Sequence, residues 1–203
     1  ITKSGKRDDS VLNHRIHRQK QEGLYYVEYH PVGGDADVEH LLAALDYAVT
    51  LDQVEARIAP DEAIFFINLT ADEARKIASL TDDSAVNDFR RSVSCVGATV
   101  CQIGMQDSNG LLKAIFTHLD EKGIDTKKLP RLHISGCPHS CGTHQIGEIG
   151  FHGSVKLVDK KPQPAFILVD GGSEHMGSEN FGKMAGNIVS TKIPEFMEGQ
   201  NYD

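Results

Sequence analysis

The sequence predicts an α+β protein whose elements fall into two successive units. Between Leu24 and Leu80 the hydrophobic pattern follows the order strand, helix, strand, strand, helix. A polar segment at about 81–87 separates this region from a second one that contains a long helix and several short apolar strands. The 203 residues are enough for one large domain or two small ones, each with its own hydrophobic core.

The first unit begins with a strand, a turn and a helix. LYYVEYH (24–30) is rich in aromatic and β-branched residues, which is typical of a strand, and VGGD (32–35) indicates a turn. ADVEHLLAALDYAVT (36–50) places its apolar residues on one helical stripe. The basic residues before this point lie between positions 3 and 20, so we expect residues 1–22 to form a solvated linker.

Two strands and a second helix complete the first unit. QVEARIA (53–59) has alternating apolar residues, and AIFFINL (63–69) is a continuous apolar run of strand length. Thr70 and Glu73 have the spacing of a capping box, which predicts that a helix begins at this point. The element order is that of most of a ferredoxin-like β-α-β-β-α-β unit, which we expect over residues 23–85.

The second unit is expected over residues 88–203. NGLLKAIFTHLDEKG (109–123) has the periodicity of a helix, with Gly123 as its C-terminal stop. The predicted strands are RLHIS (131–135), SVKLV (154–158) and PAFILVDGG (164–172). A glycine-rich stretch and a short helix after Pro194 are expected near the C-terminus.

The composition excludes two classes of protein. The net charge of −8 is opposite to that of a typical nucleic-acid binder, so we expect no nucleic-acid partner. No apolar run approaches the roughly 18 residues of a membrane span, and no signal peptide is visible. We therefore expect a cytoplasmic protein without a membrane partner.

Four cysteines carry the strongest chemical signal in the sequence. Cys95 and Cys101 form a C-x5-C pair, and Cys137 and Cys141 form a C-x3-C pair. A disulfide framework is disfavoured without a sign of secretion, and the C-x5-C spacing fits structural zinc poorly. A [4Fe–4S] cluster takes four thiolates and is larger than one ion, so the spacing indicates an iron–sulfur site. For the neighbouring His139 and His144, ordinary polar contacts are favoured over metal ligation.

Two motifs carry a family resemblance. SGCPHSCGTHQIGEIGF (135–151) resembles the signature of siroheme-containing nitrite and sulfite reductases, and CVGATVC (95–101) resembles the upstream cysteine pair of the same family. HRQKQEGLYYVEYHPVGG (17–34) is similar to the entry to the second ferredoxin-like half-domain. Residues 19–23 of this stretch resemble the ferredoxin-dependent nitrite reductases more than the sulfite reductases. The resemblance extends over about residues 15–197.

The resemblance implies a [4Fe–4S] cluster bound by Cys95, Cys101, Cys137 and Cys141, in an α/β siroheme and cluster domain. It further implies that Cys141 bridges to the siroheme iron. Lys183 and Lys192 are candidate contacts for the siroheme carboxylates, with an ordinary surface position as the alternative. The implied activity is the six-electron reduction of nitrite to ammonia, or of sulfite to sulfide, with ferredoxin or a similar electron donor.

The resemblance also implies that the chain is the C-terminal half of a reductase built from two homologous halves. The basic residues that hold the anion lie in the N-terminal half, which is therefore the expected partner, and we assign no catalytic residue here. The turn in RIAPDEAIFF (57–66) carries Asp61 and Glu62, where the copy in the first half of the family carries an arginine. His139 stands where the family commonly has asparagine. A non-catalytic iron–sulfur electron-transfer domain without siroheme is the alternative, and a zinc-bound structural module is a weaker one.

Overall fold

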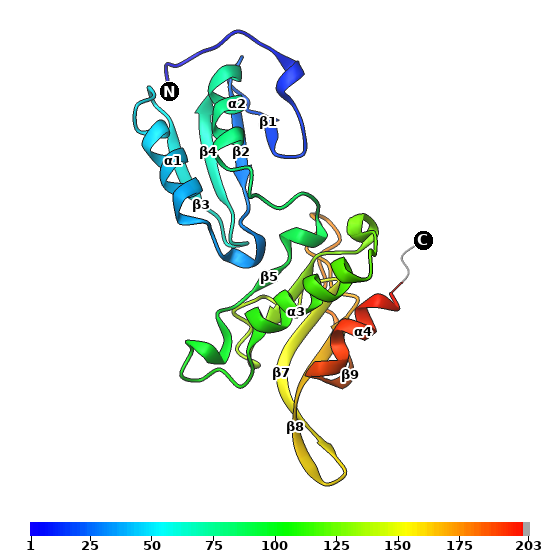
Figure 1. Ribbon diagram of the computed structural model, residues 1–203. Helices are drawn as coiled ribbons and strands as arrows, with labels where there is room; N and C mark the ends of the chain where they lie inside the picture. The colour runs from blue at the N-terminus through cyan, green and yellow to red at the C-terminus, as the bar shows by residue number, and fades with distance from the viewer. Residues whose placement is uncertain (201–203) are drawn as a thin grey trace. The chain divides into compact units, whose positions relative to one another are not determined.

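The computed structural model describes residues 1–200 and divides into two compact units, Ile1–Val86 and a second that begins at Asn87 (Figure 1). Each unit contains one β-sheet, which agrees with the predicted α+β class. The division falls within the polar segment at 81–87. Among the described residues, no helix is long and apolar enough to cross a membrane.

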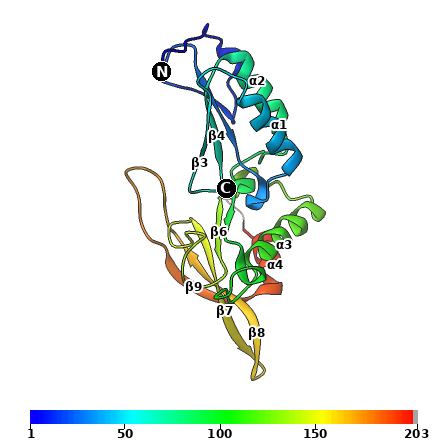
Figure 2. The same cartoon turned by 90° about the vertical axis from the view of Figure 1, so that its left-hand side faces the viewer.

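The first unit is a four-stranded antiparallel sheet with two helices on one face (Figures 1 and 2). Its helices are α1 (Val38–Ala48) and α2 (Ala71–Leu80), and its strands in spatial order are β1 (Ile16–Arg18), β2 (Tyr25–Tyr29), β4 (Ile64–Leu69) and β3 (Glu55–Ile58). The predicted capping box is present, since the Thr70 side chain and the Glu73 carboxylate each accept from the other's backbone N–H group. The core lies between sheet and helices and contains Val27, Tyr29, Phe66, Ala74 and Ile77.

Strand β1 differs from the expectation that residues 1–22 form a linker. It pairs with β2, and Ile16 and Val11 are buried in the core of the unit. The order β2–β4–β3 is that of the first three strands of a ferredoxin-like unit, and β1 pairs with the remaining edge of β2. Pairing satisfies backbone groups that would otherwise be unpaired at that edge. The three residues of β1 are too few to produce a strand pattern in the sequence.

The second unit is a five-stranded mixed sheet. In its spatial order, the first two strand pairings are parallel and the last two are antiparallel. In spatial order the strands are β5 (Val93–Ser94), β6 (Leu132–Ser135), β7 (Ile149–Val158), β8 (Lys161–Asp170) and β9 (Lys183–Val189). The glycine-rich stretch expected near the C-terminus thus contains a strand. KMAGNIV has weak hydrophobic alternation, and its pairing with β8 makes it a strand.

Two helices pack side by side in the second unit, α3 (Ser108–Glu121) and α4 (Ile193–Glu198) (Figure 2). The Asp107 carboxylate caps α3 by accepting from the Gly110 N–H group, and the apolar stripe of α3 is buried. Helix α4 carries Pro194 in its first turn, where the missing N–H group has no cost. The C-terminal ends of β5 and β6 lead directly into the cysteine segments.

Candidate functional site

Parallel pairing places two of the four cysteines next to each other. Ser94 of β5 lies opposite Ile134 of β6, Cys95 follows β5 directly, and Cys137 follows β6 after one intervening residue. The Cys95 N–H group donates to the Ile134 carbonyl at 3.0 Å. The Gly136 N–H group donates to the Cys95 sulfur at 3.1 Å. Because the C-terminal ends of parallel strands share one sheet edge, Cys95 and Gly136, 41 residues apart in sequence, meet there, and Cys137 follows Gly136 directly.

The loop that carries Cys101 is fastened to the same edge. The Cys101 N–H group donates to the Gly97 carbonyl at 2.8 Å. At the other end of the loop, the Met105 and Gln106 N–H groups both donate to the Gly136 carbonyl, at 3.0 and 2.9 Å. A β-carbon at Gly136 would lie 2.6 Å from the Gln106 carbonyl oxygen, so this close approach requires glycine.

The turn from Cys137 to Cys141 gives its two sulfurs different environments. Cys137 is buried and Cys141 is exposed. Ser140 and Thr143, on either side of Cys141, have φ values of 62° and 52°, which are uncommon for residues with a side chain. The His139 Nδ1 atom lies 3.3 Å from the Cys137 sulfur, so this histidine contacts a candidate ligand directly.

The four cysteines are free thiols. Zinc–sulfur bonds of about 2.3 Å would bring tetrahedral sulfurs to within about 3.8 Å of one another. Among the described residues, no group of three or more His, Cys, Asp or Glu ligand atoms within 4.8 Å of one another includes a cysteine. A metal cluster is larger than one ion and takes more widely spaced thiolates. The Cys95 sulfur also lies 3.1 Å from the Ser108 hydroxyl.

The two candidate lysines lie at the surface of the second unit. Lys183 begins β9, opposite Asp170 of β8, and its side chain is exposed. The Lys192 ammonium group forms an exposed ion pair with Glu195 at 3.2 Å. In the part of the chain that the structure describes, no recorded contact joins either lysine to the cysteine segments. Their role as cofactor contacts remains a prediction.

A buried histidine cluster lies beneath the Cys141 turn, and the sequence analysis did not identify it as a group. It consists of His133 of β6, His144 of the following loop and His152 of β7. The rings of His144 and His152 lie 4.7 Å apart between centroids. Burial, the largest cause, together with the neighbouring His152 and His133 lowers the pKa of His144 to about 4. His144 is therefore neutral at physiological pH.

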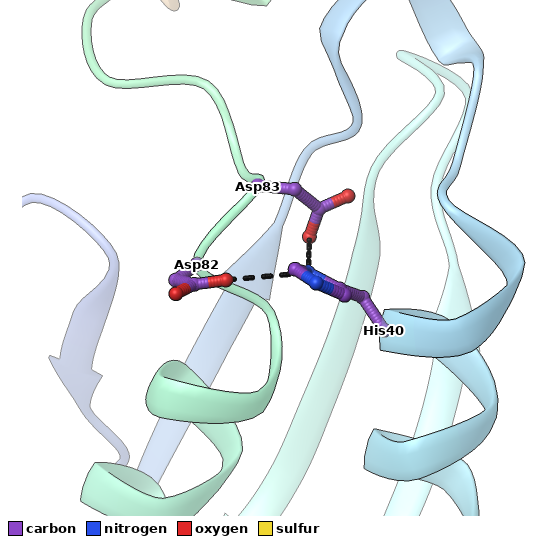
Figure 3. Close-up of side chains that lie close together, drawn as sticks. All are labelled: His40, Asp82 and Asp83. Atoms are coloured by element: carbon purple, nitrogen blue, oxygen red, sulfur yellow. Dashed lines mark hydrogen bonds and ion pairs between the residues drawn. The ribbon is translucent and has the colours of Figure 1, made fainter.

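A second polar cluster lies in the first unit (Figure 3). The His40 Nδ1 atom on α1 lies 3.0 Å from Asp83 Oδ1 and 3.2 Å from Asp82 Oδ1. The Tyr29 hydroxyl donates to the other Asp83 oxygen at 2.7 Å. The hydrogen bond to Asp83 raises the pKa of His40 above its ordinary value. We interpret the cluster as an ion pair that fastens the segment after α2 to α1.

Sequence comparison relates this chain to two groups of reductases. No family model matches the chain. It is 24% identical over 185 residues to a sulfite reductase [NADPH] hemoprotein beta-component of Bacillus licheniformis, covering 83% of the chain and 32% of the relative. It is 29% identical over 191 residues to a chloroplastic ferredoxin–nitrite reductase of Betula pendula, covering 88% of the chain and 31% of the relative. The chain thus spans about one third of the length of these relatives, both oxidoreductases by name.

Solved structures share the fold. The Mycobacterium tuberculosis NirA protein superposes with a TM-score of 0.74 at 21% identity, over 92% of this chain and 36% of that one. Dissimilatory sulfite reductase I superposes with a TM-score of 0.57 at 9% identity, over 82% of this chain and 58% of that one. At these identities the likeness supports the fold alone. The chain is thus similar in sequence to sulfite and nitrite reductases and shares the fold of the NirA protein.

Proposed function

We propose that this chain is the C-terminal, cluster-bearing part of a siroheme-dependent reductase that reduces nitrite to ammonia or sulfite to sulfide. One observation carries the proposal: the Gly136 N–H group donates to the Cys95 sulfur, which joins the two cysteine motifs at one sheet edge. Four free thiols in two adjoining segments are the donor set that a [4Fe–4S] cluster requires.

The backbone around the cysteines fits a cluster. Hydrogen bonds from N–H groups to ligand sulfurs tune the potential of iron–sulfur centres, and Gly136 already supplies one to Cys95. The Gly136 carbonyl accepts from Met105 and Gln106, and this fixes the Cys101 loop beside the Cys137 turn. These bonds hold the three segments that carry the candidate ligands next to one another, which supports the proposal.

The four cysteines differ in exposure, and the proposal gives them different roles. In the proposal Cys95, Cys101 and Cys137 hold the cluster, and the exposed Cys141 holds the cluster and the siroheme iron. When bound, the cofactors supply electrons to the substrate anion, and the protein supplies ligands, orientation and hydrogen bonds. Lys183 and Lys192 are secondary candidates for contacts with siroheme carboxylates, since both ammonium groups are at the surface.

The site needs more of the protein than this chain contains. An anionic substrate and a carboxylate-rich haem require positive charge, and this chain has a net charge of −8. In the proposal an N-terminal part of the reductase supplies the basic residues, and ferredoxin or a similar protein donates electrons. We expect the isolated chain to bind a cluster but to reduce neither nitrite nor sulfite.

Anaerobic reconstitution of the chain with iron, sulfide and siroheme tests this proposal. We expect about four irons and four sulfides per chain, with haem bands added when siroheme is present. Cys101→Ser should lower the iron content, whereas Cys141→Ser should abolish coupling between haem and cluster. Ser140→Ala, in the same turn, is the matched control. A chain that takes up no iron, or a Cys141→Ser variant with unchanged haem–cluster coupling, would contradict the proposal.

A cluster-binding domain without siroheme is the alternative function. The exposure of Cys141 is compatible with it, because a thiolate at the edge of a cluster can also face a protein partner. The same reconstitution separates the two, since the alternative predicts broad cluster absorption without haem bands. A zinc-bound module would remain colourless.

A further inference from the structure

We propose that His144 is a positioning residue that holds the turn carrying Cys141, acting through the hydroxyl of Ser135. The proposal depends on the proposed function only in making Cys141 a ligand; the positioning itself concerns residues that the structure places in contact. Ser135 ends β6 and His144 follows the turn, and both residues are buried.

A chain of two hydrogen bonds carries the proposal. The Gly142 N–H group donates to the Ser135 Oγ atom at 3.0 Å. The Ser135 Oγ atom lies 2.9 Å from His144 Nδ1. A serine hydroxyl has one hydrogen to donate, and a neutral imidazole has one accepting nitrogen. We assign that hydrogen to His144 Nδ1, which leaves Oγ free to accept from Gly142, the residue next to Cys141.

The turn needs such a restraint. Ser140 and Thr143 both adopt left-handed backbone conformations, which cost on the order of 1 kcal/mol or more for residues with a side chain. A β-carbon at Gly142 would lie 2.1 Å from the Ile134 carbonyl oxygen, so the turn is pressed against β6. A strained backbone persists where its surroundings define it, and here the Ser135 hydroxyl is one of the groups bound to it.

The surroundings of His144 keep its ring in place. The His152 ring packs against it at 4.7 Å. His133, whose Nδ1 atom lies 2.8 Å from the Thr143 hydroxyl, fastens the other side of the turn. A β-carbon at Gly150 would lie 1.9 Å from the His144 carbonyl oxygen, so β7 also contacts the backbone of His144. These contacts hold the accepting nitrogen toward Ser135.

Substitutions at position 144 give a matched test. His144→Asn places an amide atom close to the position of Nδ1 and should preserve the hydrogen bond to Ser135. His144→Leu has the shape of asparagine and no polar atom, so it should lose the bond. In the metal-free chain, we expect the Gly142 amide of the leucine variant to exchange at least about tenfold faster than in wild type. Alkylation of Cys141 should also become faster, while the asparagine variant behaves as wild type.

The reconstituted chain supplies a second readout. His144→Leu should change the visible spectrum and the midpoint potential of the bound cluster, and His144→Asn should restore both. His175→Leu, at an exposed position, is the control for a histidine lost elsewhere in the same unit. Equal Gly142 exchange in wild type and His144→Leu, with equal cluster spectra, would overturn the proposal.

Further measurements separate the loss of the His144 contact from misfolding and from a failure of the proposed function. Protection of the Phe166 amide in β8 reports whether the unit is folded. Where His144→Leu does not fold, His144→Gln replaces it, because its amide lies one carbon too far to reproduce Nδ1; wild-type exchange at Gly142 in His144→Gln would also overturn the proposal. A wild-type chain that binds no cluster rejects the proposed function, while the metal-free exchange data still decide the role of His144.

Discussion

The backbone N–H group of Gly136 donates a hydrogen bond to the sulfur of Cys95 at 3.1 Å. This bond joins a residue that follows β6 to a residue that follows β5, and it exists because the two strands are parallel neighbours. It is also the direct link between the C-x5-C and C-x3-C motifs.

The close approach at this link predicts that Gly136→Ala is destabilising. The new methyl group would lie 2.6 Å from the Gln106 carbonyl oxygen and 3.0 Å from the Gly97 Cα atom, and both are backbone atoms that cannot turn aside. We expect a loss of about 1–3 kcal/mol in the free energy of unfolding in urea. Gly186→Ala is the control, since nothing lies within 4 Å of its added carbon. Equal stability of the two variants would contradict the prediction.

The different exposure of the cysteines predicts an order of alkylation in the metal-free chain. Cys141 is exposed, Cys95 and Cys101 are half-buried, and Cys137 is buried. Under native conditions we expect iodoacetamide to modify Cys141 first and Cys137 last, as measured by mass spectrometry of digested protein. The order should disappear in urea. Modification of Cys137 as rapidly as Cys141 in the folded chain would be evidence against the burial described here.

The neutral, buried His144 predicts a loss of stability in acid. Its pKa is about 4 in the folded chain, below the ordinary value of about 6.5 for an exposed histidine. The unfolded chain therefore binds the additional proton between these two pH values, and the free energy of unfolding falls as pH decreases through this window. The free energy of unfolding falls by at most about 3 kcal/mol through this group, and most of this loss is reached near pH 4.

The comparison with His144→Asn isolates this effect, because asparagine does not titrate. We expect the stability difference between wild type and His144→Asn to change between pH 6.5 and 4, and to be constant above pH 7. Urea titrations at several pH values measure it. A pH-independent difference would show that His144 accepts a proton in the folded state as easily as in the unfolded state.

The ion pairs of His40 predict the opposite pH dependence. Asp83 raises the pKa of His40 in the folded chain, so the folded state holds the proton more tightly than the unfolded state. The stabilisation is complete below about pH 6.5 and is lost as pH rises through the folded pKa. NMR titration should show a His40 pKa above the ordinary value. Asp83→Asn should lower it more than Asp82→Asn, because the Asp83 hydrogen bond is the largest cause of the shift.

The helices and the longer strands were predictable because their patterns are local. The stripe of α1, the capping box of α2 and the Gly123 stop after α3 each arise from residues within a few turns of one another. β1 and β5, of three and two residues, were not predicted, since strands so short are defined by the neighbour they pair with. The same reason explains β9, whose pairing with β8 compensates for its weak pattern.

The sequence by itself determined the four cysteines in two spaced pairs and the resemblance to siroheme reductases around Cys137 and Cys141, and it predicted an α+β fold. Those features are covalent or local, so they can be recognised from the order of the residues alone. Only the tertiary structure decided that Gly136 bonds to Cys95, that Cys141 is exposed while Cys137 is buried, and that His144 reaches Cys141's turn through Ser135. These relationships depend on strand pairing and burial across long stretches of chain, which no local pattern encodes.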